Sequence, residues 1–63
     1  MSDLPRGIGA PATRALTAAG LTTLEQVAGA SSAELLALHG VGSRAIRVLT
    51  EALAEHGLAP LRP

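Results

Sequence analysis

The sequence predicts a compact all-α domain of five short helices with approximate twofold symmetry between residues 4–20 and 38–58. Apolar residues recur at the three- and four-residue spacing of helices, and glycines interrupt that pattern at intervals. Residues 7–19 also align without gaps with residues 40–52. Two copies of one unit are too few for a solenoid and suit a pseudo-twofold domain. Identical residues match Gly7, Gly9, Ala12, Arg14, Leu16, Thr17 and Ala19.

Composition limits the size and chemistry of this domain. A chain of 63 residues forms one domain with a small core, and its apolar 48% contains no aromatic residue and no cysteine. The missing aromatic rings disfavour single-stranded nucleic-acid modules, which stack bases on them. Without cysteine there is no disulfide framework, and no apolar run reaches membrane-span length, so a soluble cytoplasmic protein is expected. The net charge is zero, so binding must depend on where the charges lie.

The first half of the chain predicts two helical segments. Ser2 or Asp3 can cap a single turn that holds Leu4 and ends at Gly7. A helix is expected from Ala10 to Ala19, because Pro11 is tolerated in a first helical turn and the apolar residues behind it recur at helical spacing. Gly20 is expected to end this helix.

Three further helices follow from capping signals. Thr22 to Glu25 has capping-box spacing and predicts a short helix to about Ala28, and Ser31 to Glu34 repeats the device for a helix from near Ser32. Ser43 is expected to cap the last helix, which runs to about His56 before Gly57. Residues 1–58 then form the domain, and residues 59–63 a loosely held, flexible tail. The expected core is Ile8, Leu16, Leu24, Val27, Leu35, Leu36, Val41, Ile46, Leu49 and Leu53.

The two Gly-x-Gly turns are the candidate binding elements. A turn of this kind before a helix exposes backbone N–H groups near Gly42, Ser43 and Arg44, where the helix dipole also favours an anion. The first turn repeats the arrangement, although Pro11 lacks one donor. A valine at Gly42 should damage the fold, because φ at this position is expected to be positive.

Arginines flank both turns. If the repeat symmetry brings the turns to one face, four of the five basic residues lie there, so a neutral protein carries one basic face. His39 occupies the place of Arg6 and either adds a pH-dependent phosphate contact or is simply exposed. The bland alternative is that the glycines end helices and the arginines are solvated. The candidate site comprises Arg6, Gly7, Gly9, Arg14, His39, Gly40, Gly42, Ser43, Arg44 and Arg47.

The sequence gives no indication of catalysis or of a cofactor. His39 and His56 are far apart in the chain and have no cysteine or cluster of carboxylates near them, so no metal site is expected. Ser43 has no base near it in sequence, so an enzyme is disfavoured. Both turns match the loose Gly-x-Gly-x-x-Ala pattern of dinucleotide-binding folds, but that fingerprint needs a preceding strand and a parallel sheet.

Five helices with two duplicated after Gly-x-Gly turns resemble the paired helix-hairpin-helix domain, within the group of SAM-domain-like bundles. Over nearly the whole chain, the sequence is similar to the C-terminal domain of the bacterial RNA polymerase alpha subunit, through residues 19–25, 34–36, 40–42 and 53–58. The resemblance implies a bacterial transcription module that contacts the DNA minor groove and its phosphates, and that can touch regulatory proteins.

Two positions depart from that family's pattern. Pro11 stands where the family has a groove-inserting arginine, and Gly40 where it has an asparagine, whereas Arg44 matches a basic position. These departures favour a generic contact with the sugar-phosphate backbone over recognition of a promoter element. The leading hypothesis is a duplex-DNA-binding module of low sequence specificity. The alternative is a protein-interaction module that docks on transcription or DNA-processing machinery without binding DNA.

Overall fold

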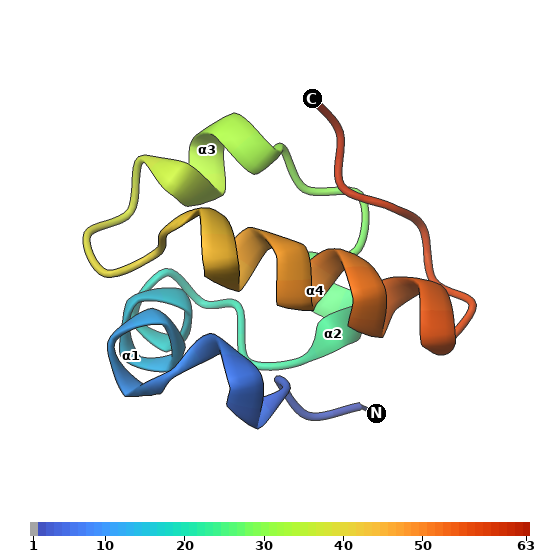
Figure 1. Ribbon diagram of the computed structural model, residues 1–63, viewed down its shortest axis with the longest axis horizontal. Coiled ribbons are helices and arrows are strands. Elements are labelled where there is room, and N and C mark those ends of the chain that lie inside the picture. The colour runs from blue at the N-terminus through green and yellow to red at the C-terminus, as the bar shows by residue number, and fades with distance from the viewer. Residues whose placement is uncertain (1) are drawn as a thin grey trace.

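The computed structural model describes residues 2–63, which fold as a helical domain (Figure 1). It contains a 3₁₀ turn, η1, and four α-helices, and no strand occurs among these residues. Helix α4 crosses the middle of the domain, with α3 on one side and η1 and α1 on the other. The all-α prediction is therefore confirmed, but the elements are four α-helices and one 3₁₀ turn. Their bounds are η1 Arg6–Ile8, α1 Ala10–Ala18, α2 Leu24–Val27, α3 Ser32–Leu36 and α4 Ser43–Glu55.

The first turn lies later than the sequence pattern predicted. Residues before it are extended, because Asp3 forms an antiparallel bridge with Thr23 and the Leu24 N–H donates to the Ser2 carbonyl at 2.8 Å. The first helical residue is Arg6, so Ser2 and Asp3 lie too far before it to serve as its cap. Pro5 precedes η1 instead, with an extended backbone and no side-chain cap.

The core is aliphatic and surrounds α4. Leu49 and Leu53 of that helix are fully buried, as are Leu16 and Val27. Ala12 and Ala45, which occupy matching positions in the two copies, are buried at 1% and 4% exposure and allow close helix packing. Partly buried residues that pack against this core include Leu4, Leu21, Leu38, Leu58 and Leu61.

Most of the predicted core is confirmed, with two exceptions. Ile46 is only half-buried, and Leu36 is 47% exposed. Leu35 takes the inward position on α3, and the next residue of a helix points about 100° away from it. The local pattern of three leucines could not decide which one faces the core.

The helix caps differ from the sequence prediction by one residue at α2. Thr23, rather than Thr22, is the N-cap: its hydroxyl accepts from the Gln26 N–H at 3.2 Å, and the Gln26 side chain accepts from the Thr23 N–H. Glu25 instead accepts from the Ser2 N–H at 2.8 Å, and this hydrogen bond holds the pKa of its carboxyl below the ordinary value. Ser31 caps α3 as predicted, accepting from the Glu34 N–H at 3.3 Å.

The first glycine of each copy packs against the helix of the other copy. A Cβ added to Gly40 would lie 2.8 Å from the Pro11 carbonyl oxygen, and one added to Gly7 would lie 3.3 Å from Val48 Cγ1. The two turns nevertheless differ in backbone, because φ is positive at Gly9 in the first copy and at Gly40 in the second. The sequence repeat is therefore not reproduced as two equal turns.

Gly42 does not have the backbone that the sequence analysis expected. Its φ is −114° and its ψ −177°, an extended conformation open to any residue, and an added Cβ would meet nothing within 4 Å. The expectation that valine here must damage the fold is therefore wrong in its premise.

The C-terminal segment lies against the α2–α3 connection, in contrast to the loosely held tail expected. The Arg62 N–H donates to the Ala30 carbonyl and the Ser32 N–H donates to the Arg62 carbonyl, both at 2.8 Å. The Arg62 guanidinium Nε donates to the Gly29 carbonyl at 2.8 Å. Across residues 2–63, the helices are all too short or too polar to cross a membrane.

We expect Gly40→Ala to destabilise the domain more than Gly20→Ala. Both glycines have positive φ, at +99° and +84°, so either alanine meets a left-handed strain of roughly 1–2 kcal/mol. Only Gly40 faces a backbone carbonyl, and the overlap should add about 1–3 kcal/mol. Urea unfolding followed by far-UV circular dichroism measures both losses, and equal losses would contradict the close approach of the two copies.

Candidate functional site

The four helices divide into two classes by how their N-termini are capped. The connecting helices α2 and α3 have side-chain caps, Thr23 and Ser31. The helices after the Gly-x-Gly turns, α1 and α4, have glycine N-caps, Gly9 and Gly42, with no side-chain hydrogen bond. Because the first N–H groups of a helix have no partner within it, α1 and α4 leave donors open at their starts.

Helix α4 has the fuller set of open donors. Its backbone ladder begins with the Ile46 N–H, which donates to the Gly42 carbonyl at 3.1 Å. The N–H groups of Ser43, Arg44 and Ala45 precede that bond and find no acceptor in the part of the chain that the structure describes. Ser43 is the first residue of α4 rather than its cap, which corrects the sequence prediction. Its hydroxyl is consequently available to contact a ligand.

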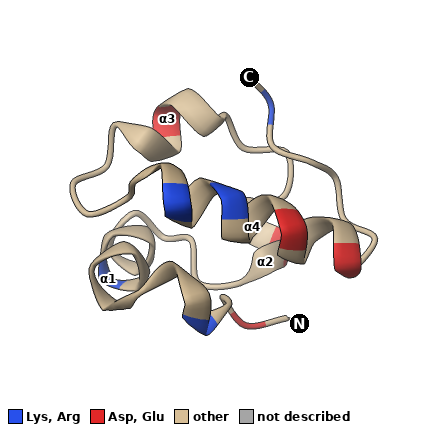
Figure 2. Cartoon of the chain, in the orientation of Figure 1, with Lys and Arg blue, Asp and Glu red and all other residues tan. Residues whose placement is uncertain are grey.

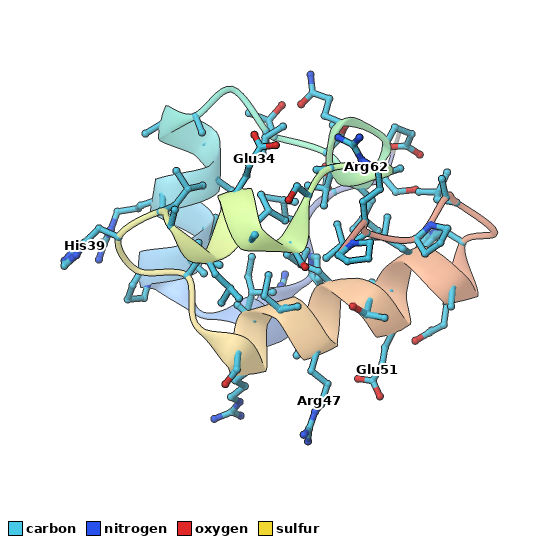
Figure 3. All side chains as sticks on the ribbon, turned by 90° about the horizontal axis from the view of Figure 1, so that it is seen from above. Glu34, His39, Arg47, Glu51 and Arg62 are labelled. Carbon is cyan, nitrogen blue, oxygen red and sulfur yellow. The ribbon has the colours of Figure 1, made fainter. Side chains whose placement is uncertain are left out.

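A surface hollow of about 280 Å³ lies at this helix start, lined by Ser43, Arg44 and Arg47. The two arginines are three residues apart, so they share one face of α4. Both are exposed, and Figure 3 shows Arg47 extended away from the body of the domain. Backbone donors, a hydroxyl and two guanidinium groups therefore surround one opening, a chemistry suited to an oxyanion such as phosphate.

The basic and acidic residues of α4 are arranged in the order opposite to the one that its helix dipole favours. Figure 2 shows its basic residues in the half nearer the N-terminus and its acidic residues, Glu51 and Glu55, in the half nearer the C-terminus. Acidic residues stabilise a helix at its start and basic residues at its end, by typically ~0.3–1 kcal/mol each. Helix α4 has neither an acid in its first turn nor a base in its last. Its stability would gain from the reverse order, whereas an anion at the N-terminus gains from the order present.

The first turn is the poorer donor site. Pro11 lies in the first turn of α1 and contributes no N–H, and Gly9 precedes it with φ +87°. The Thr13 N–H and hydroxyl both donate to the Gly9 carbonyl, at 3.0 and 2.9 Å. Ala10 and Ala12 supply the remaining N–H groups of this helix start. Arg6 and Arg14, on either side of the turn, are exposed.

The two copies of the repeat pack against each other, so residues of the first copy, 7–19, lie beside α4 and the turn before it. Gly7 packs on Val48, one helical turn from Arg44, so η1 runs alongside the basic half of α4. Pro11 packs on Gly40, and Arg14 shares the face of α1 that carries Pro11. His39, next to Gly40, is exposed and points outward in Figure 3.

Of the predicted site residues, only Ser43, Arg44 and Arg47 line the hollow. The other seven lie at or near the two turns and do not line it: Arg6, Gly7, Gly9, Arg14, His39, Gly40 and Gly42. Sequence analysis missed the contribution of Glu51 and Glu55, which complete the reversed polarity of α4. Two basic residues followed by two acidic ones at helical spacing would have revealed it. Among residues 2–63, no group of three or more acidic, histidine or cysteine residues gathers to hold a metal ion.

Comparison with known proteins adds no assignment: no family model matches the chain, and neither a curated protein nor a solved structure gives a significant match.

Titration with inorganic phosphate should perturb the start of α4 selectively. We expect the amide resonances of Ser43, Arg44 and Ala45 to shift in proton–nitrogen NMR spectra, because their N–H groups are open. Amides in the first turns of α2 and α3 serve as internal controls, since Thr23 and Ser31 cap those helices. Equal shifts at all helix starts would show that capping does not determine where the anion binds.

Proposed function

We propose that this protein binds duplex DNA with low sequence specificity, seating a backbone phosphate at the start of α4. The observation that carries the proposal is the N-terminus of α4, which has no side-chain cap and has Arg44 and Arg47 beside it. Basic residues at a helix N-terminus lower helix stability, because the helix dipole is positive there. A bound phosphate would accept from the open N–H groups and neutralise the arginines. The resemblance to the C-terminal domain of the polymerase alpha subunit, with its matching basic position at Arg44, supports the same function.

The chemistry of the hollow favours the sugar-phosphate backbone over base edges. Backbone N–H groups, a serine hydroxyl and guanidinium groups recognise phosphate oxygens, and such contacts position a protein on DNA without reading its sequence. The absence of aromatic residues argues against a single-stranded target, for which stacking supplies much of the affinity. With zero net charge and few arginines, the dissociation constant should fall near the ~10⁻⁴ to 10⁻⁶ M of non-specific binders at physiological salt.

The second copy should act as the main contact and the first copy as a weaker one. The start of α4 offers three N–H groups and a hydroxyl, whereas Pro11 removes a donor from the start of α1. Arg6, Arg14 and His39 border the two turns and would reach phosphates on either side. NMR titration with a short duplex at low salt tests the proposal as a whole. Unchanged spectra would reject it and favour the protein-docking alternative.

Removing the Arg44 charge should weaken DNA binding and flatten its salt dependence. We expect Arg44→Gln to reduce the slope of log affinity against log salt by ~0.9, the value for one lost phosphate contact. Ala18→Glu is the matched control, because it changes the net charge by the same amount at an exposed position whose aligned residue in the second copy is Glu51. Fluorescence anisotropy of a labelled duplex measures both slopes, and equal slopes would mean that Arg44 makes no phosphate contact.

Gly42→Asp should block the proposed phosphate site, because the new carboxylate can occupy its N–H groups. The extended backbone of Gly42 is that of an N-cap residue, so an aspartate there can accept from the open N–H groups of α4. Stability should rise by a few tenths of a kcal/mol, while DNA affinity falls about tenfold or more, or ~1.4 kcal/mol. Gly42→Ala, which has no acceptor, should bind DNA like the parent. If the aspartate variant also binds like the parent, the start of α4 is not the phosphate site.

A further inference from the structure

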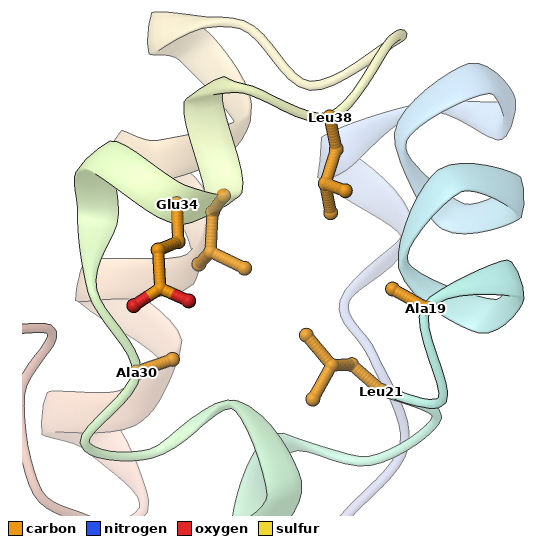
Figure 4. Close-up of a pocket in the computed structure, with 6 residues that line it drawn as sticks. Ala19, Leu21, Ala30, Glu34 and Leu38 are labelled. Atoms are coloured by element: carbon orange, nitrogen blue, oxygen red, sulfur yellow. The ribbon is translucent and has the colours of Figure 1, made fainter.

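A second hollow lies between α1 and α3 and has a different character from the first. It encloses about 290 Å³ and is lined by five aliphatic residues and one carboxylate. Figure 4 shows Leu21 and Leu38 projecting into the opening from the two sides, with Glu34 at one end near Ala30. The full lining is Ala19, Leu21, Ala30, Glu34, Leu35 and Leu38. We refer to these six residues as the α1–α3 groove.

Glu34 is the polar group of the groove. Its backbone N–H donates to the Ser31 hydroxyl, as in a capping box, yet no hydrogen bond engages its carboxylate among residues 2–63. The Glu25 carboxylate, by comparison, accepts from the Ser2 N–H. Glu34 therefore does not return to cap its own helix, and Figure 4 shows its carboxylate beside the apolar wall. An occupant would meet the negative charge of Glu34 at the edge of an aliphatic surface, whereas the nearby Arg62 guanidinium already donates to the Gly29 carbonyl.

Charge complementarity identifies the occupant. We propose that the α1–α3 groove binds a segment of a partner protein that presents a lysine or arginine beside aliphatic residues. Such a side chain packs its methylene stem against leucines while its charged head reaches a carboxylate. Nucleic acid is a poor match, since Glu34 would repel phosphates. The volume lies at the lower limit of the ~300–1,000 Å³ typical of small-molecule pockets, so one or two side chains suit it better than a larger ligand.

The α1–α3 groove lies on a different side of the domain from the hollow lined by Ser43, Arg44 and Arg47, which we call the arginine hollow. Figure 3 shows Glu34 and Arg47 on opposite sides of the ribbon, and the two hollows have no lining residue in common. The inference is independent of the proposed DNA contact, because it uses none of the same residues. If both surfaces bind, the domain joins a basic protein segment to DNA, with both ligands bound at once.

NMR titration with two matched peptides tests the proposal. The probe is a capped peptide, Ala-Leu-Lys-Ala-Leu-Leu-Lys-Ala, and its control carries acetyl-lysine, which keeps the stem and removes the charge. We expect the lysine peptide to shift the methyl resonances of Leu21, Leu35 and Leu38 and to bind about two- to fivefold more tightly than its control, the range of an exposed ion pair. In Glu34→Gln, the two peptides should bind equally.

A variant that fills the groove separates binding there from binding elsewhere. Ala19 is exposed, so Ala19→Leu should preserve the fold while occupying the opening, and it should weaken both peptides without changing the affinity for duplex DNA. The proposal is overturned if neither peptide binds, if the shifts map outside the groove, or if acetylation has no effect on the parent protein. It is also overturned if duplex DNA shifts the same methyl groups.

Discussion

The close approach of Gly40 to the Pro11 carbonyl is the constraint on which this domain depends. It brings the turn before α4 against the start of α1, in a space that would not hold a methyl group. A second contact between the copies is made by Gly7 of the first copy, which packs against Val48 of the second. Together they place both Gly-x-Gly turns beside helices of the opposite copy, so the position of the α4 N-terminus is set by packing between copies rather than by its own sequence. The arginine hollow therefore depends on contacts made some distance from it.

Sequence reasoning succeeded where the signal was local or periodic. The start of α1, the Ser31 cap and most core residues follow from helical spacing and capping chemistry. It failed where a distant segment decides the outcome. Pairing of residues 2–3 with Thr23 and Leu24 sets the start of α2, so Thr23 becomes the cap although Thr22 has the same chemistry. Within the candidate site, Arg44 and Arg47 could be named from the sequence, but the role of Ser43 depended on the backbone of Gly42.

Helix α4 illustrates a conflict between stability and binding in a protein with little stability to spare. A chain of this size buries a limited apolar surface, and every buried large side chain here is aliphatic. Capping α4 with aspartate and exchanging its charges would strengthen it at no cost to packing. That the sequence does neither agrees with the proposed role of α4 in holding an anion. The connecting helices, which carry no such role in this proposal, retain their side-chain caps.

The hydrogen bonds of Arg62 with residues 29–32 bear on how the chain folds as it leaves the ribosome. Contacts between segments that are far apart in the sequence close large loops, and they form more slowly than local helices. Helix α4 supplies much of the core and lies near the end of the described chain, followed by Leu58 and Leu61 against that core. The nascent helices before it therefore have little to pack against. The domain should acquire its native structure only after residues 58–62 have emerged from the exit tunnel.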